Sequence, residues 1–168
     1  TAAAVTGAAY AALTMLLAPI SYGAIQCRVS EVLCILPFFI PCTAWGLFVG
    51  CAIANLLSAA GIFDVVFGSL LAALCTAWLG RGRGAQSWVR CILAALMPVV
   101  FNFLLVGAVL TWSLTDAVFP HLNASFWVFG GQVALGEVIV LGVLGLPLMR
   151  LLPRNPKFRE IIRSYQKE

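Results

Sequence analysis

Charged residues and histidine are scarce in this sequence. Lys, Arg, Asp and Glu make up 10% of the 168 residues, whereas a soluble domain of this size has about 25%. This shortage argues against a soluble protein. The apolar residues form long runs rather than one stripe of each helix, which indicates a membrane protein with several spans. The single histidine, His121, has no cysteine near it, and this argues against a zinc site.

Several catalytic and nucleotide-binding motifs are also missing. The sequence has no G-x-x-x-x-G-K-[ST] phosphate loop, so we expect no ATP hydrolysis by that route. It has no G-x-S-x-G or H-E-x-x-H motif, which argues against the usual intramembrane hydrolases. None of the six cysteines forms a C-x-x-C pair, and most lie in apolar runs, as is typical of small buried side chains. We therefore expect neither an enzyme nor a cofactor.

The basic residues that are present gather in two segments. Arg81, Arg83 and Arg90 lie in one segment, and six more lie between positions 150 and 167. Lys and Arg concentrate in cytoplasmic loops of membrane proteins. The distribution therefore indicates membrane sidedness rather than binding to nucleic acid.

The long apolar runs predict an all-α integral membrane protein with about six spans. The predicted spans cover residues 2–18, 30–40, 42–59, 63–79, 88–114 and 125–152. Two of these spans separate the two basic segments, so both segments can lie in the cytoplasm, together with both termini. We interpret the first run as a mature span and not a signal peptide, because it has no basic n-region.

The chain divides into a six-helix membrane domain at residues 1–152 and a tail at residues 153–168. In the tail, apolar residues follow i, i+3, i+4, i+7 spacing at Phe158, Ile161, Ile162 and Tyr165, between basic residues. This pattern predicts an amphipathic helix on the cytoplasmic surface of the bilayer. Docking onto a cytoplasmic partner is the alternative interpretation.

A polar segment at residues 22–31 interrupts the apolar sequence between the first two runs. Ionisable groups near a bilayer are usually kept for function or for pairing with each other. Arg28 and Glu31 are therefore candidate binding residues, although they could simply pair with each other at i, i+3 spacing. Tyr22 and Gln26 are candidates because they belong to the same segment.

Glu137 lies near the middle of the last run, on a helix face that it shares with Gly130, Ala134 and Gly145. A carboxylate beside missing side-chain volume favours a polar ligand or a neighbouring helix at this position. The alternative is a buried glutamate that is hydrogen-bonded to a neighbour's hydroxyl or amide group.

Asn102 and Asp64 are the remaining polar candidates. Asn102 lies four residues after Pro98, so its amide could bond the carbonyl that the proline frees, or it could offer a donor and an acceptor to a heterocycle. Asp64 is either a binding residue or only the first residue of a helix.

Small residues repeat along the first run in two neighbouring rows. One row contains Ala4, Ala8 and Ala12, and the other contains Ala3, Gly7 and Ala11. Small residues four apart let another helix approach closely in a membrane. The rows predict either a docking face for a partner subunit or packing within the bundle.

Several segments resemble the QueT family, in the right order along nearly the whole chain. They are PISYGAIQCRVSE at residues 19–31, LPFF at 36–39, GLFVGCAIAN at 46–55, DVVFGSL at 64–70, GE at 136–137 and LGLPL at 144–148. The first segment departs from the expected pattern at Ala24 and Cys27, where proline and phenylalanine are expected. The tail beyond Pro156 lies outside the resemblance.

The resemblance implies a substrate-binding S component of an energy-coupling factor importer in the bacterial plasma membrane. Its ligand would be a queuosine precursor, which is a 7-deazaguanine, and its partners would be a transmembrane coupling subunit and two ATPase subunits. It also implies that Ala4, Ala8 and Ala12 contact the coupling subunit. There are two alternative functions. One is an S component for another vitamin-like or amino-acid ligand, and the other is a membrane scaffold without transport.

Overall fold

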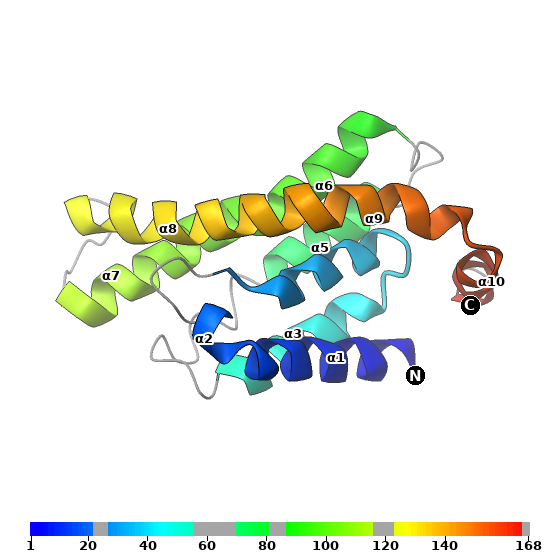
Figure 1. The fold of residues 1–168 in the computed structure, drawn as a ribbon, viewed down its shortest axis with the longest axis horizontal. Coiled ribbons are helices and arrows are strands. Elements are labelled where there is room, and N and C mark those ends of the chain that lie inside the picture. The colour runs from blue at the N-terminus through cyan, green and yellow to red at the C-terminus, as the bar shows by residue number, and fades with distance from the viewer. Residues whose placement is uncertain (22–26, 56–69, 81–86, 116–122, 166–168) are drawn as a thin grey trace.

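The computed structural model describes residues 1–21, 27–55, 70–80, 87–115 and 123–165, and every regular element in these ranges is helical (Figure 1). In chain order the elements are α1 (Ala2–Leu16), α2 (Ala18–Ser21), η1 (Val29–Phe38), α3 (Thr43–Asn55), α5 (Leu70–Gly80), α6 (Trp88–Phe101), η3 (Asn102–Val106), α7 (Gly107–Thr115), α8 (Ala124–Val140), η5 (Leu141–Gly145), α9 (Leu146–Leu151), η6 (Leu152–Arg154) and α10 (Pro156–Tyr165). The all-α prediction is therefore confirmed for the described part of the chain.

Two continuous helices are long and apolar enough, by length and composition, to cross a membrane. They are Trp88–Thr115, with 28 residues, and Ala124–Arg154, with 31 residues. At about 1.5 Å per residue, each exceeds the roughly 30 Å of a bilayer's hydrocarbon core. The two helices lie side by side (Figure 1). Their bounds agree closely with the last two predicted spans, while the count of six spans stays a prediction.

Each long helix contains one wider turn of π-helix. Pro147 has no N–H to donate to the carbonyl of Val143, and the helix adopts π geometry over η5, just before this proline. The other wide turn, η3, begins at Asn102, one turn after Pro98. Single π turns are frequent at functional sites.

The shorter helices α1 and α3 pack against each other in the same direction. The backbone of Gly46 lies against that of Ala3, and the backbone of Gly50 lies against that of Gly7. Only glycine permits this approach, because a Cβ at either α3 position would collide with the backbone of α1. One of the two small rows of α1, which includes Gly7 and Ala11, is therefore used for packing within the bundle.

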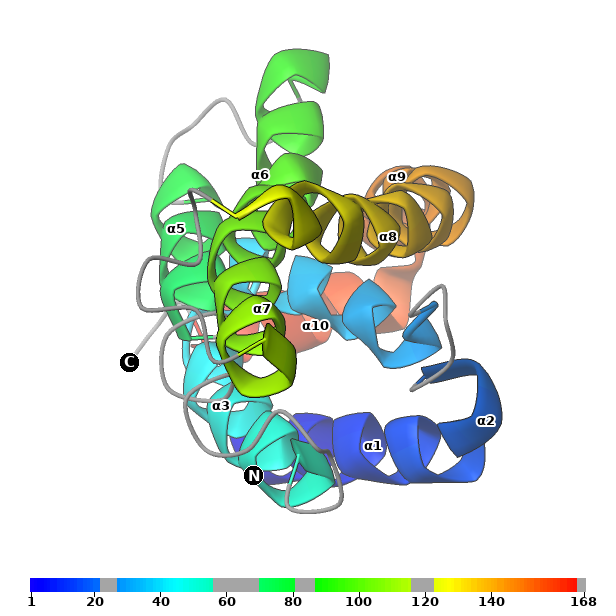
Figure 2. The ribbon, with the colours of Figure 1, turned by 90° about the vertical axis from the view of Figure 1, so that its left-hand side faces the viewer.

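The segment η1 lies between the α1–α3 pair and the long helices (Figures 1 and 2). It is a 3-10 helix of 10 residues with Pro37 inside it, where the apolar run at residues 30–40 predicts a span. At about 2 Å per residue it is shorter than a bilayer's hydrocarbon core. The apolar core lies on both sides of η1: Ile35 and Phe38 pack with residues of α6, η5 and α9, while Cys34 packs with Tyr10 of α1 and residues of α3.

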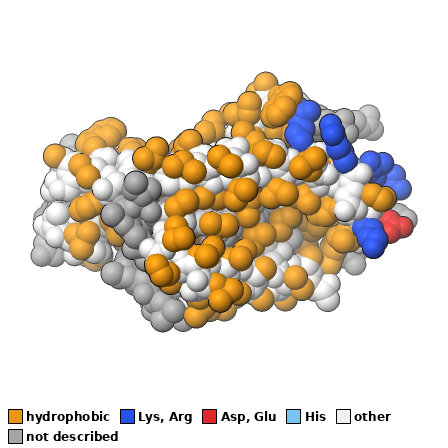
Figure 3. All heavy atoms as spheres, in the orientation of Figure 1, with side chains coloured by type: hydrophobic (Ala, Val, Ile, Leu, Met, Phe, Trp, Pro, Cys, Tyr) orange, Lys and Arg blue, Asp and Glu red, His pale blue; other side chains and the backbone are white. Residues whose placement is uncertain are grey.

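The start of α1 and the tail helix α10 meet at one end of the molecule (Figure 1). The exposed side chains along the visible face are largely hydrophobic, and Lys and Arg gather at this end (Figure 3). The molecule therefore has an apolar flank and one basic end.

Candidate functional site

About half of the buried polar side chains of the described residues gather around η1 and the neighbouring faces of α1, η3 and α8. Glu31 and Glu137 are each 2% exposed, so both carboxyl groups are removed from solvent and lipid. A buried polar group is destabilising unless it is hydrogen-bonded, so the partners of these groups define the site. The other buried polar residues in this region are Thr14, Arg28, Ser30 and Asn102.

Glu31 is held by α1 and by its own helix. The hydroxyl of Tyr10 donates to Oε1 of Glu31 at 2.6 Å, and the thiol of Cys34 donates to Oε2 at 2.9 Å. One turn further along α1, Thr14 Oγ1 donates to Ser30 Oγ at 2.6 Å. Both carboxylate oxygens of Glu31 are therefore engaged, and α1 is bound to the first turn of η1 through side chains.

Glu137 is bonded to the other long helix. The side-chain amide of Asn102 donates to Oε1 of Glu137, across 35 positions of the sequence. Asn102 is the first residue of the π turn η3, and Glu137 lies one turn before η5. This bond matches the alternative interpretation of Glu137, in which a buried glutamate is hydrogen-bonded to a neighbour's amide group. The amide of Asn102 is thus directed at a carboxylate of another helix.

The two carboxyl groups belong to one cluster. Direct contacts between η1 and α8 bring together the elements that carry Glu31 and Glu137. The Cys27 thiol, just before η1, donates to the carbonyl of Gly136 at 3.9 Å, which places the start of η1 beside the turn that carries Glu137. Arg28 is 5% exposed and caps the N-terminus of η1, three residues before Glu31.

Four of the seven predicted binding residues thus come together in the structure. Arg28 is the residue just before η1, Glu31 belongs to η1, Asn102 to η3 and Glu137 to α8. The other three, Tyr22, Gln26 and Asp64, lie outside the described residues. The structure brings together two carboxylates, an amide, a guanidinium and a phenol, which is a set of hydrogen-bonding groups suited to recognising a polar ligand.

Sequence reasoning missed the contribution of α1 to this site. Thr6, Tyr10 and Thr14 are spaced four apart and all face inward, with Tyr10 1% exposed. This polar row in an otherwise small and apolar helix is a signal that could have identified Tyr10 and Thr14. The two rows of small residues drew attention to helix contacts, either with a partner subunit or within the bundle.

The second small row of α1 faces away from the bundle. Ala4, Ala8 and Ala12 are exposed, whereas Gly7 and Ala11 are buried against α3. One helix therefore presents polar groups to the site, glycine to α3 and a flat row of alanines to its surroundings.

The described residues include no group of three or more His, Cys, Asp and Glu side chains placed to hold a metal ion. Residues 1–154 match the model of the QueT transporter family. Comparisons with curated proteins and with solved structures return no significant match. The family match ends with η6, so α10 lies outside it.

Proposed function

The chain belongs to the QueT transporter family, and on this premise we propose that it is the substrate-binding S component of an energy-coupling factor importer. As a member of this family it is a membrane transporter with a small-molecule substrate. The proposal adds that the substrate is a queuosine precursor, captured from outside the bacterial plasma membrane. A transmembrane coupling subunit and two ATPase subunits would drive its delivery inward.

The single observation that carries this proposal is the buried cluster around Glu31 and Glu137. A 7-deazaguanine presents a ring N–H and an exocyclic amine side by side, which suits two hydrogen bonds to one carboxylate. Its carbonyl group accepts from an amide or a guanidinium, as Asn102 and Arg28 supply. The positive charge of an aminomethyl substituent would suit the second carboxylate.

The hydrogen bonds already present indicate how a ligand would be accommodated. Glu137 accepts from Asn102, and Glu31 accepts from Tyr10 and Cys34. A ligand donor would replace one of these protein donors, so that no buried oxygen loses its partner. We place Glu137 and Asn102 deepest in the site, with Arg28 and Gln26 closing it from the segment before η1.

The proposed topology has six spans and both termini in the cytoplasm. Its support is that the start of α1 and α10 lie at one end, where Lys and Arg gather (Figures 1 and 3). Basic residues concentrate on the cytoplasmic side. The site between η1 and α8 would then be loaded from the opposite side.

The experiment that tests the proposed ligand is calorimetric titration of the purified chain with aminomethyl-deazaguanine, cyano-deazaguanine, queuine and guanine. Tight binding of one precursor, with guanine much weaker, is the expected result. A folded protein that binds none of them would refute the queuosine assignment and leave the membrane transporter class intact.

A substitution at Glu137 tests the site itself. Glu137→Gln keeps the shape of the side chain but removes the charge, and a hydrogen bond to a charged group contributes about 1.5–3 kcal/mol. We expect affinity to fall at least about tenfold. Glu160→Gln in α10 is the matched control, because it makes the same change at an exposed position. Unchanged binding by Glu137→Gln would refute the site assignment.

The exposed row of Ala4, Ala8 and Ala12 supports docking of the coupling subunit. Small residues let another helix approach closely, and a large side chain would prevent this approach. We expect Ala8→Trp to bind ligand normally but to block transport in the assembled importer. Val143→Trp is the control, since Val143 is 66% exposed on a different helix. Normal transport by Ala8→Trp would exclude this row as the docking face.

A further inference from the structure

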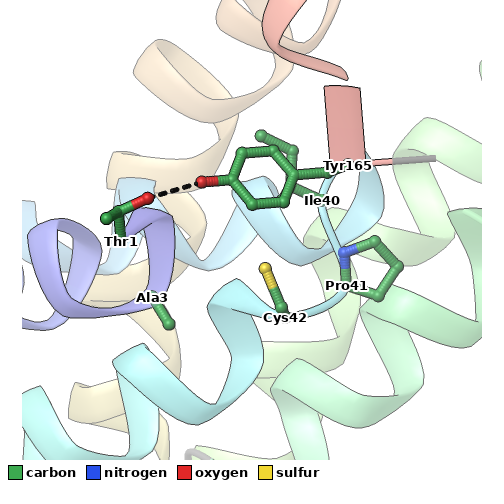
Figure 4. Close-up of a pocket in the computed structure, with 6 residues that line it drawn as sticks. All are labelled: Thr1, Ala3, Ile40, Pro41, Cys42 and Tyr165. Carbon is green, nitrogen blue, oxygen red and sulfur yellow. Dashed lines mark hydrogen bonds between the residues drawn. The ribbon is translucent and has the colours of Figure 1, made fainter. Parts of the chain in front are cut away.

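Two residues of the apolar stripe of α10, Phe158 and Tyr165, pack on the body of the protein. The rings of Phe158 and Phe39 pack edge to face, with centroids 5.6 Å apart. The hydroxyl of Tyr165 lies 2.9 Å from Thr1 Oγ1 and accepts from the backbone N–H of Ala2 at 3.2 Å. Figure 4 shows Tyr165 reaching to Thr1 above a hollow that is also lined by Ile40, Pro41 and Cys42. In this position, Phe158 and Tyr165 face the protein and not the acyl chains of the bilayer.

Basic side chains of α10, together with Arg154 at the end of η6, are exposed and available. Arg154, Lys157 and Arg163 are exposed, and their side chains form no ion pair within the described part of the chain. Arg159 differs from them, because its guanidinium donates twice to the carbonyl of Pro153, at 3.3 and 3.1 Å, and so holds the corner before α10. A shallow hollow of about 280 Å³ is lined by Pro156, Lys157, Arg159, Glu160 and Arg163.

The basic face directly follows a helix that is long and apolar enough to cross a membrane. The long helix Ala124–Arg154 leads into α10 through one residue, Asn155. Just before that corner, the guanidinium of Arg150 lies 3.7 Å from the ring centre of Trp88, which is 53% exposed. Exposed tryptophans and basic side chains near helix ends are typical of the membrane–water interface.

We propose that the basic face of Arg154, Lys157 and Arg163 binds the phosphate headgroups of anionic phospholipids. Clusters of basic residues next to a membrane span attract anionic lipids through charge. A protein partner would need an apolar core for a stable interface, and the two aromatic residues of the stripe that could supply it already contact Phe39 and the start of α1. This inference is independent of the proposed ligand and of the importer, because it uses no residue of the buried site, and Lys157 and Arg163 lie outside the family match.

The test measures the affinity of the full chain, in neutral detergent micelles, for fluorescent phosphatidylglycerol and phosphatidylcholine. We expect phosphatidylglycerol to bind much more tightly, and its affinity to fall as salt screens the charges. The triple variant R154Q/K157Q/R163Q should weaken phosphatidylglycerol binding about a hundredfold, because each of the three basic residues contributes separately to binding an anionic lipid. Glu160→Gln should strengthen it, because this change removes a negative charge from the same helix.

The matched control is R81Q/R83Q/R90Q, which removes the same charge from the other basic segment. It should retain most of the phosphatidylglycerol affinity. Equal losses in the two triple variants would refute the proposal, because they would indicate diffuse attraction and no particular surface. Equal binding of the two lipids would also refute it. Competition by inorganic phosphate at the lipid's concentration would refute the lipid assignment in favour of a free anion.

Discussion

The close crossing of α1 and α3 depends on Gly50, and Gly50→Ala tests it. A Cβ at this position would lie 2.8 Å from the Cα of Gly7 and 2.9 Å from its carbonyl carbon. Both are backbone atoms, so no side-chain rotation can relieve the contact and the helices must move apart. Overpacking costs about 1–3 kcal/mol, and a contact with backbone places Gly50→Ala at the upper end. Alanine regains about 1 kcal/mol in helix propensity, which leaves a net loss of about 2 kcal/mol.

The control for this prediction is Gly131→Ala in α8. No atom lies within 4 Å of a Cβ built at Gly131, so the change should stabilise the helix by up to about 1 kcal/mol. Equilibrium unfolding of both variants in mixed micelles, followed by circular dichroism, should separate them by about 3 kcal/mol. Equal stability of the two variants would show that α1 and α3 do not approach through Gly50.

Three further substitutions test the buried bonds and the tail. Tyr10→Phe removes a donor from buried Glu31 and should lower the free energy of unfolding by about 1–3 kcal/mol in the same assay. Thr14→Val leaves the hydroxyl of Ser30 without this partner and should lower it by about 1–2 kcal/mol. Phe158→Ala removes the ring contact that holds α10 on the body, and should speed tryptic cleavage within α10.

Each of these changes has a control elsewhere in the chain. Tyr165→Phe removes two hydrogen bonds, neither of them buried, and should change stability by less than Tyr10→Phe. Thr111→Val loses only a bond to the carbonyl of Gly107 in its own helix, so it should cost less than Thr14→Val. Ile161→Ala changes a side chain that is 46% exposed and should leave cleavage nearly unchanged. A variant that behaves like its control would contradict the contact assigned to it.

The sequence by itself determined the class of the protein and its two long helices. Apolar runs of this length are compatible with few structures other than membrane helices, and the runs at residues 88–114 and 125–152 lie within two residues of the helices observed. It also drew attention to Glu137, Asn102, Glu31 and Arg28, because ionisable and amide groups stand out in an apolar sequence. These features are local, and local patterns can be recognised without knowing what packs against them.

Only the tertiary structure decided which groups meet. The bond from Asn102 to Glu137 and the bond from Tyr10 to Glu31 join different elements. Likewise, the packing of α3 decided that Gly7 faces inward while Ala8 stays exposed, although both belong to rows of small residues. Periodicity shows that side chains share a helix face, but not which element covers that face. That choice depends on close packing among helices that lie far apart in the sequence.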